Sequence, residues 1–545
     1  MFDRLLSFRR WARPTLSPEA LLLVVALAWA LLFNRPVLAA LRQELEAGWG
    51  LQAAVVALLA AIHYLLVAPL LGVRWTQALL ALLTVVAACS SHYTHNLGVV
   101  LDPAMMRNVL QTEWQEAREL IGWGLLRQLL WALPILLVLA WVRVEGPAHA
   151  SFWRLAWRRM ALWGVALGVA VALLLAMFQP LSSLMRNQKG LRYQMLPVAP
   201  LYSMPRSVWK GLQEARKPRE PIGEDAQAGP APARPRLLVW VVGETVRAAN
   251  WGRYLLPEGG ERVTAPQTQA QAEWVYFPVM KTCGTDTETS LPCMFAPVGR
   301  SDYDEDRIRT QQSLLHVLAR AGVQVDWWDA QSGCKGVCEG LPERRIECKK
   351  GGCDAQLFAG LPEKIAAVRQ AGSGTHLLVL HMLGNHGPSY YRRYGPEHAV
   401  FQPECRSDDL GRCSREAIRN AYDNALHATD ALLAQALKQL QVAQTDMDVA
   451  LWFTPDHGES LGEKGLYLHG LPYAFAPAEQ TDVPWLMWVG EGWRRSRGWA
   501  ELCLQTLPSR LRPDHEHLFH TALTLLDVRT RLYQPRWDAL AACAP

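Results

Sequence analysis

Long apolar segments are confined to the first 180 residues of this 545-residue chain. Most have close to the roughly twenty residues that a helix needs to cross the hydrocarbon core of a bilayer. Helices buried in a large soluble protein are the alternative, but five such segments before one polar region argue against it. We therefore predict an α-helical transmembrane bundle of five helices, in segments 20–41, 51–73, 75–89, 125–142 and 160–178.

Basic residues predict how this bundle is oriented. The N-terminal tail carries Arg4, Arg9, Arg10 and Arg13, and the loop 143–159 is also rich in arginine. Loops with an excess of Lys and Arg remain in the cytoplasm. Both segments therefore lie inside, and five crossings place everything after residue 180 on the opposite side of the membrane.

Cysteine usage supports the same topology by an independent argument. Ten of the eleven cysteines follow residue 280, and only Cys89 lies in an apolar segment. So many cysteines in one soluble region indicate disulfides and an oxidising compartment. Zinc-ribbon spacing is the alternative, but the sequence contains no CxxC. The cysteines form close couples, namely Cys283 with Cys293, Cys334 with Cys338, Cys348 with Cys353 and Cys405 with Cys413, and Cys503 with Cys543 is a fifth candidate.

The loop between the third and fourth apolar segments contains a predicted amphipathic helix near residues 102–121. Asn108, Thr112 and Glu116 recur every four residues, so they would share one face of that helix. A polar face on a surface helix is the ordinary explanation. The functional interpretation is a polar shelf just above the bilayer that meets a lipid headgroup.

The chain after the apolar segments divides into two further parts. Segment 181–235 begins with mixed aromatic and basic residues, typical of interfacial helices, and ends in a linker rich in Pro, Ala, Gly and charge. Segment 236–545 is the predicted catalytic domain. The net charge of +5 and the lack of a long basic run argue against nucleic acid as a partner.

Buried strands and helices alternate in the predicted catalytic domain. This alternation predicts an α/β sheet with helices on both faces. The expected strands are 236–243, 323–328, 376–381 and 449–453, with helices at 306–321 and 415–441 among those between them.

Residues that commonly bind metals follow three of these strands. Glu244 follows the first, His386 follows the third, and Asp456 and His457 follow the last, with His469 twelve residues beyond. The carboxyl ends of parallel strands meet at one edge of an open sheet, so these side chains should converge. A structural role is commoner for any one of them, but carboxylate and imidazole ligands together are typical of catalytic zinc. The pattern therefore predicts a metal site.

The segment KTCGTDTETSLPCMF supplies candidate nucleophiles. Cys283 and Cys293 bracket four hydroxyls, those of Thr285, Thr287, Thr289 and Ser290. A disulfide across so short a loop contributes little chain entropy, but it would hold one hydroxyl still. A divalent cation favours the alkoxide, which can attack phosphorus while nearby cations such as Lys335 offset the developing charge. A threonine-rich turn with two structural cysteines is the alternative.

Several blocks of the sequence resemble one family in order and content. They are VVGETVRAANWGRY, TCGTDTETSLPCMF, CKGV, GNHGPSYYRRY and DHGESLGEKGLYLHGLPYAFAPAEQTDVP, with NVLQTEWQEA upstream. Over nearly the whole chain they resemble the phosphoethanolamine transferases that modify lipid A, including the mobile colistin-resistance enzymes. The resemblance implies an alkaline-phosphatase/sulfatase-like domain in the periplasm, anchored in the bacterial inner membrane.

The resemblance also implies site residues and a reaction. Thr287 would be the nucleophile and would bind Zn²⁺ together with Glu244, Asp456 and His457. Phosphatidylethanolamine would give its headgroup to Thr287, releasing diacylglycerol, and a lipid A phosphate would then accept it. Masking that phosphate weakens attraction to polymyxins and other cationic peptides. We expect a monomer. The implied headgroup- or phosphate-binding residues are Asn108, Thr112, Glu116, Lys335, His386 and His469, and either histidine is a candidate ligand of a second zinc.

Two departures and several rivals accompany this interpretation. Gln331 stands where the family leads us to expect Asn, and we expect this to alter headgroup contacts and to leave the zinc ligands untouched. The extra couple Cys334 and Cys338 would pin the Lys335 loop if oxidised, and favours the chromosomal branch over the mobile one. The rivals are transfer to core sugars of lipopolysaccharide, a phosphatase or sulfatase of the same fold, a lipoteichoic-acid synthase, and a non-catalytic scaffold, which the retained site residues disfavour.

Overall fold

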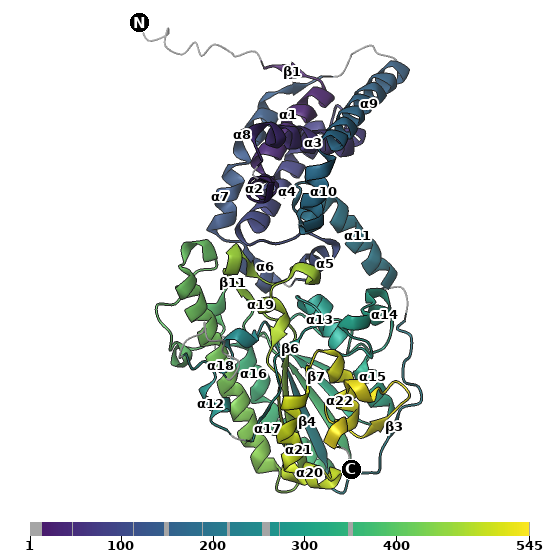
Figure 1. The fold of residues 1–545 in the computed structure, drawn as a ribbon, viewed down its shortest axis with the longest axis vertical. Coiled ribbons are helices and arrows are strands. Elements are labelled where there is room, and N and C mark those ends of the chain that lie inside the picture. Colours follow the sequence, from purple (N-terminus) through teal and green to yellow (C-terminus); the bar gives the residue numbers. More distant parts are fainter. Residues whose placement is uncertain are drawn as a thin grey trace. The chain divides into compact units, whose positions relative to one another are not determined.

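The computed structural model describes residues 13–543 except 46, 113, 146–151, 188, 215–217, 253–261, 272 and 347–351. The chain divides into two compact units (Figure 1). The described residues of Met1–Met106 and Gly122–Arg206 form the first unit, and those of Arg107–Ile121 and Ser207–Pro545 form the second. The second unit thus includes the loop 107–121, and it begins upstream of the boundary predicted at residue 236.

The first unit is helical. Among the described residues, three helices are long and apolar enough to span a membrane, Trp49–Leu70, Thr76–Asn96 and Trp153–Ala176. Two bent pairs pass the same test together, Pro18–Leu32 with Arg35–Gln43 and Trp123–Leu130 with Leu133–Trp141. Both bends have a proline at the start of the second helix, where its ring interrupts the hydrogen-bond ladder. Among the described residues the number of spans is therefore three, or up to the predicted five if each bent pair is one span.

Tryptophans are divided between two environments. Trp49, Trp123 and Trp153 of the first unit are largely exposed, as expected for an aromatic belt at a membrane interface. Trp240 and Trp452 of the second unit, by contrast, are fully buried. They are register partners on adjacent strands, and their rings stack with centroids 4.6 Å apart.

The second unit is built on a seven-stranded sheet of order β5-β14-β10-β4-β9-β7-β8. The segment from β10 to β8 is parallel, whereas β14 is antiparallel to β10 and β5. The four predicted strands are all present and lie side by side as β10, β4, β9 and β7. The bounds are β5 Val275–Tyr276, β14 Leu486–Val489, β10 Asp448–Pro455, β4 Arg236–Gly243, β9 Thr375–His381, β7 Gln324–Asp329 and β8 Glu343–Arg345.

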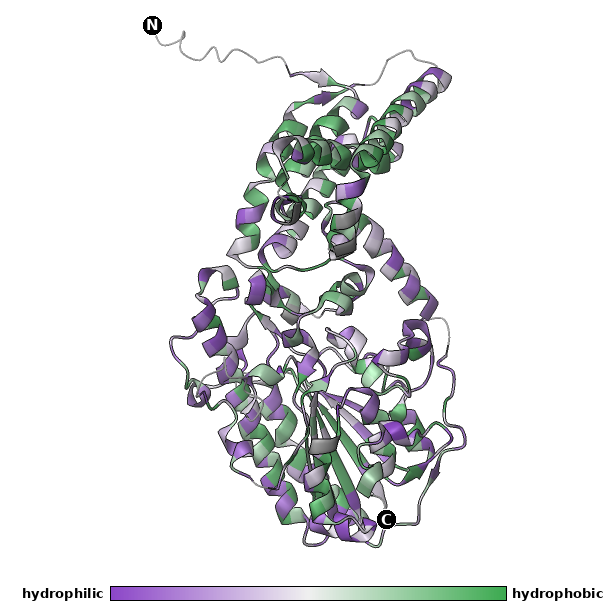
Figure 2. Cartoon of the chain, in the orientation of Figure 1, coloured by the Kyte–Doolittle hydropathy of each residue, from purple (hydrophilic) through white to green (hydrophobic). Residues whose placement is uncertain are grey.

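Helices cover both faces of this sheet, as predicted (Figure 1). Helices α16 (Cys353–Ala359), α17 (Leu361–Ala371) and α18 (Arg415–Ala443) lie on one side. Helices α13 (Thr287–Met294), α15 (Leu314–Arg320) and α22 (Glu516–Leu525) lie on the other. Figure 2 shows the strands as a hydrophobic layer between helices of mixed hydropathy, the arrangement expected for strands buried on both faces.

Two predicted helices are each interrupted. The helix expected at 306–321 is instead α14 (Glu305–Thr310) and α15, because Ser313 forms a capping box that begins a new helix. The helix expected near 102–121 is α5 (Pro103–Gln111) and α6 (Trp114–Leu120). Here the Thr112 hydroxyl donates to the Asn108 carbonyl at 2.8 Å, a back-bond that bends helices.

Ion pairs join this loop to the rest of the second unit. Arg107 of α5 pairs with Glu305 at 2.9 Å and with Glu214 at 3.4 Å. Glu119 of α6 pairs with Arg393 at 2.6 Å. The predicted linker is also attached, since Ile222 is part of the core and β3 (Gln227–Ala228) pairs with β15 (Val528–Arg529).

Four of the predicted cysteine couples are disulfides. They are Cys283–Cys293, Cys334–Cys338, Cys405–Cys413 and Cys503–Cys543. Cys348 lies outside the described residues, and Cys89 is a free cysteine.

Candidate active site

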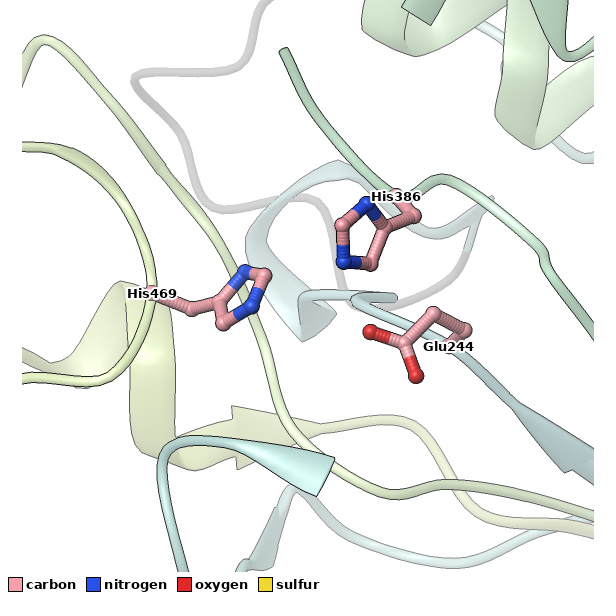
Figure 3. A group of neighbouring side chains, drawn as sticks. All are labelled: Glu244, His386 and His469. Carbon is pink, nitrogen blue, oxygen red and sulfur yellow. The ribbon is translucent and has the colours of Figure 1, made fainter. Parts of the chain in front are cut away.

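The carboxyl ends of β4, β9 and β10 bring the predicted ligands together. Register pairs Pro455 of β10 with Gly243 of β4, so Asp456 and Glu244 follow at adjacent strand ends. Ligand atoms of Glu244, Asp456 and His457 all lie within 4.8 Å of one another, and so do those of Glu244, His386 and His469. Figure 3 shows the second group, with both imidazoles and the carboxylate around a common space. The predicted convergence of two carboxylates and three imidazoles is confirmed.

Two glycines let the strand-end loops approach this closely. A Cβ atom at Gly384, whose φ is +49°, would lie 2.7 Å from the Glu244 carbonyl oxygen. A Cβ atom at Gly458 would lie 2.1 Å from the Glu479 carbonyl oxygen. Side chains at either position would therefore push apart the loops that carry His386 and His457.

The group around Glu244 and Asp456 fits a divalent cation. Among the described residues, Glu244 Oε1 and Asp456 Oδ2 are buried without a hydrogen-bond donor. Burial, and then the Asp456 carboxylate, raise the pKa of Glu244 well above its ordinary value. A cation would remove this penalty by pairing with both carboxylates.

His457 has the protonation state that a ligand needs. Burial lowers the pKa of its imidazole to about 4, so the ring is neutral at pH 7. Its Nδ1 donates to the Gly458 carbonyl at 2.9 Å, which leaves the lone pair of Nε2 directed at the carboxylates. A backbone acceptor on the second nitrogen is the usual support of a metal-bound histidine.

Metal binding should therefore release protons. Without metal, Glu244 retains its proton until the pH exceeds its raised pKa, so a cation must displace that proton. The contribution of Glu244 to the free energy of unfolding is fully present below the pKa that Glu244 has in the unfolded chain. This contribution is lost as the pH rises through the raised pKa of the folded protein. We expect zinc affinity to fall as pH falls and zinc to protect the protein most at high pH. Calorimetry in buffers of different ionisation enthalpy measures the release, and zero protons released would contradict this assignment.

Thr287 lies at the first position of α13 and faces the same group. Its hydroxyl donates to Glu244 Oε2 at 3.0 Å and lies 3.4 Å from His457 Nε2. Two of the other bracketed hydroxyls are bonded elsewhere, since Thr285 donates to the Leu471 carbonyl and Ser290 to the Asp456 carbonyl. Of these three hydroxyls, that of Thr287 is the one directed at the candidate metal ligands.

His469 is held by a carboxylate that the sequence analysis did not single out. Glu459 is fully buried and accepts from His469 Nδ1 at 2.7 Å and from the Tyr390 hydroxyl at 2.5 Å. Burial alone would lower the pKa of His469, but Glu459, together with Asp456 and Asp286, raises that pKa on balance. The imidazole is thereby suited to carry a positive charge beside an anionic substrate. The signal was its place in the block DHGES, two residues after His457.

Lys335 lies on a tightly constrained loop. Its backbone φ is 50°, an uncommon conformation for a residue other than glycine, and the Cys334–Cys338 disulfide encloses it. Its ammonium contacts Ser332 Oγ at 2.6 Å and lies 3.7 Å from Glu288. The cavity beside it has a volume of about 310 Å³ and is lined by Gln111, Glu214, Glu288, Arg309 and other polar residues.

The predicted polar shelf is only partly described. The Glu116 side chain lies outside the described residues, and among those described neither Asn108 nor Thr112 hydrogen-bonds to the strand-end ligands. Gln111 of the same helix was not predicted. With its amide nitrogen turned toward the carboxylate, it donates to Glu288 Oε1 at 3.2 Å. Helix α5 therefore contacts the residue next to Thr287.

Glu288 and Arg309 form a buried ion pair next to the candidate nucleophile. Arg309 donates to the Glu288 carboxylate at 2.8 Å and to its main-chain carbonyl at 2.6 Å. Removing one partner of such a pair leaves an uncompensated buried charge, which costs about 3–5 kcal/mol. We expect Arg309→Met to lower the unfolding midpoint of the full-length protein. The matched control is Arg307→Met on the same helix, where the ion pair is exposed, and an equal effect of both substitutions would contradict this role.

The expectation that Gln331 leaves the zinc ligands untouched was wrong. Its amide nitrogen donates to Glu244 Oε2, the same oxygen that accepts from Thr287. Gln331 follows β7 closely, and its side chain reaches across to the end of β4. The departure from the expected Asn therefore acts on a candidate metal ligand.

Comparison with known proteins decides the family. A family model described as phosphoethanolamine transferase EptA/EptB matches residues 55–211, and a sulfatase model matches residues 236–528. Phosphoethanolamine transferase EptA of Escherichia coli K12 is 33% identical over 86% of this chain and 85% of its own length. Phosphatidylethanolamine transferase Mcr-1 of Escherichia coli is 34% identical over 83% of this chain and 84% of its own. The chain belongs to the phosphoethanolamine transferase family.

A solved structure extends the match to the fold. The integral membrane lipooligosaccharide phosphoethanolamine transferase A of Neisseria meningitidis is 31% identical, with a TM-score of 0.87. The match covers 97% of this transferase and 99% of that chain. The combination of a membrane-helix unit and a sulfatase-like domain is thus that of the full-length enzyme.

Proposed function

We propose that this transferase moves phosphoethanolamine from phosphatidylethanolamine to a phosphate of lipid A through a phosphoethanolamine-Thr287 intermediate. The observation that carries the proposal is the Thr287 hydroxyl, 3.0 Å from Glu244 within a group of metal-ligand residues. The identity to relatives named phosphoethanolamine transferase and phosphatidylethanolamine transferase supports the transferred group and its donor.

The first half-reaction forms a bond between Thr287 Oγ and the phosphorus of the donor. The bond from phosphorus to the diacylglycerol oxygen breaks, and diacylglycerol leaves as an alcohol after taking up a proton. Glu244 accepts the hydrogen bond of the Thr287 hydroxyl and, once the cation has displaced its own proton, would take up the proton of Thr287. Phosphoethanolamine remains on the threonine as a phosphodiester.

Several groups oppose the charge that develops on phosphorus. Thr287 begins α13, so the amino end of that helix faces the reacting phosphoryl group. His469, whose pKa is raised by Glu459, would donate to a phosphoryl oxygen. Zn²⁺ held by Glu244, Asp456 and His457 would lower the pKa of the Thr287 hydroxyl and withdraw charge from the phosphoryl oxygens.

The second half-reaction repeats the displacement with another nucleophile. A phosphate oxygen of the acceptor attacks the same phosphorus, the bond to Thr287 Oγ breaks, and the threonine recovers its proton. The product is a lipid A diphosphate that ends in ethanolamine, whose ammonium offsets negative charge, so we expect expressing cells to resist polymyxin.

One measurement tests the covalent step directly. The full-length protein is incubated with phosphatidylethanolamine vesicles, and the mass of the peptide containing Thr287 is determined. We expect an added phosphoethanolamine that is absent after zinc removal. An unmodified Thr287 under turnover, with the group on another residue, would overturn the mechanism.

The acceptor and the location need separate experiments. A more distant relative, 25% identical, is named Kdo(2)-lipid A phosphoethanolamine 7''-transferase, so a core sugar is the rival acceptor. Mass spectrometry of lipid A from expressing cells should show added phosphoethanolamine, and an unchanged lipid A with modified core sugar would favour the rival. We place the second unit in the periplasm, so a reporter fused after Gln213 should be active only outside the cytoplasm.

A further inference from the structure

Four arginines gather around one cavity that the proposed reaction does not use. The cavity has a volume of about 440 Å³ and is lined by Arg247, Arg262, Arg415, Glu416, Arg419, Leu461 and Glu463. The arginines come from three separate segments of the second unit, the loop after β4, the segment before α12 (Pro266–Gln269) and the first turns of α18. Such a concentration of guanidinium groups around one space is typical of phosphate recognition.

Carboxylates orient these arginines without exhausting their donors. Asp423 pairs with Arg262 at 3.0 Å and with Arg419 at 3.6 Å. Glu463 pairs with Arg247 at 2.8 Å and lies 3.9 Å from Arg415. Four guanidinium groups carry about twenty N–H donors, whereas the three carboxylates of Asp423, Glu463 and Glu416 accept about twelve hydrogen bonds.

Positive charge remains in excess at the cavity, because four arginines face the three carboxylates of Asp423, Glu463 and Glu416. Burial lowers the pKa of Arg419, and the neighbouring Arg262 and Arg247 lower it further, while Asp423 and Glu463 oppose them. An anion entering the cavity would reduce this repulsion, and the planar guanidinium groups offer it paired N–H donors.

Hydrogen bonds through Glu459 connect the arginine cluster to the proposed active site. Arg247 follows Glu244 by three residues and donates to the Glu459 carbonyl at 3.1 Å. The carboxylate of the same Glu459 holds His469 at 2.7 Å. Tyr422 of α18 donates to the Thr245 carbonyl at 2.6 Å and accepts from the Arg247 backbone N–H at 3.0 Å. One residue layer therefore separates the arginine cluster from the candidate phosphate-binding histidine.

We infer that this cavity binds a phosphate monoester, namely a second phosphate of the acceptor, while the first phosphate reacts at Thr287. This inference rests on the proposed function, because it needs an acceptor that carries two phosphates. The arginine cluster then favours bisphosphorylated acceptors and sets which end of them approaches Thr287.

The test compares two acceptors with the full-length enzyme in detergent. KM is measured for bisphosphorylated lipid A and for monophosphoryl lipid A, in the unaltered chain and in the double variant Arg415→Gln, Arg419→Gln. We expect the unaltered enzyme to prefer the bisphosphorylated acceptor and the double variant to raise KM for that acceptor about tenfold, since charge-assisted hydrogen bonds are lost. Inorganic phosphate should compete with the acceptor in the unaltered enzyme and compete more weakly in the variant.

Two control variants distinguish loss of the phosphate site from a general loss of positive charge and from misfolding. Arg412→Gln removes one positive charge, as Arg415→Gln does, from an exposed position just before α18 and should leave both KM values unchanged. The single variant Arg415→Gln alters a largely exposed side chain and guards against misfolding of the double variant. Equal changes in KM for both acceptors, or none, would overturn the inference. An unaltered enzyme whose Thr287 is never labelled by phosphatidylethanolamine would instead overturn the proposed function.

Discussion

Thr287→Ala is expected to reduce transfer at least about a thousandfold and to abolish labelling by phosphatidylethanolamine. Removing a nucleophile eliminates the covalent route and leaves the catalysis that binding and electrostatics supply. Mass spectrometry of lipid A from expressing cells measures the transfer. We expect Thr287→Ser to retain part of the activity, since it keeps a hydroxyl at the amino end of α13.

The matched control uses another hydroxyl of the same bracketed segment. Thr285 donates to the Leu471 carbonyl, so Thr285→Val should lower stability while leaving Thr287 competent to be labelled. Transfer that survives Thr287→Ala would show that phosphoethanolamine moves directly from donor to acceptor.

Zinc removal is expected to have an effect of similar size. The cation would contribute several kcal/mol of charge stabilisation in the transition state, which corresponds to about a thousandfold in rate. Asp456→Asn should reproduce this loss and lower the bound zinc measured by elemental analysis. Asp446→Asn is the control, because that carboxylate pairs with Arg369 on the surface.

Rescue distinguishes a catalytic metal from a contaminant. Activity of the chelated enzyme should return with Zn²⁺ and not with Mg²⁺, because imidazole is a ligand that suits zinc and carboxylate alone suits magnesium. A chelated enzyme with full activity and no bound metal would remove the cation from the mechanism.

The sheet and its strand-end residues were predictable because each depends on local pattern. A continuous apolar run such as 236–243 reads as a strand buried on both faces, and parallel strands must end at one edge. Glu244, Asp456 and His457 were therefore placed by topology alone. The choice of Thr287 among neighbouring hydroxyls came from the family resemblance, and the structure adds that two others are bonded to backbone carbonyls.

The missed residues depend on contacts between distant segments. Arg309 lies 21 residues from Glu288, and nothing in the spacing of either indicates that they pair. Gln331 follows β7 and Glu244 follows β4, and only one strand, β9, lies between these two in the sheet. The Gln331 side chain can therefore reach Glu244. The helix near 102–121 is interrupted where the Thr112 hydroxyl bonds to the Asn108 carbonyl. The four-residue spacing predicts that Asn108 and Thr112 share a helix face, but it does not predict this side-chain hydrogen bond.

The ion pairs of the loop 107–121 restrict how transferases of this kind can be recombined. The loop precedes α7 (Trp123–Leu130) in the chain, yet Arg107 pairs with Glu305 and Glu119 pairs with Arg393 in the sulfatase-like unit. A chimera spliced at residue 206 would take its loop from one parent and the acidic and basic partners from the other. The second unit is therefore discontinuous in sequence. We expect its exchange between related transferases to give a stable protein only when the loop 107–121 is exchanged together with it.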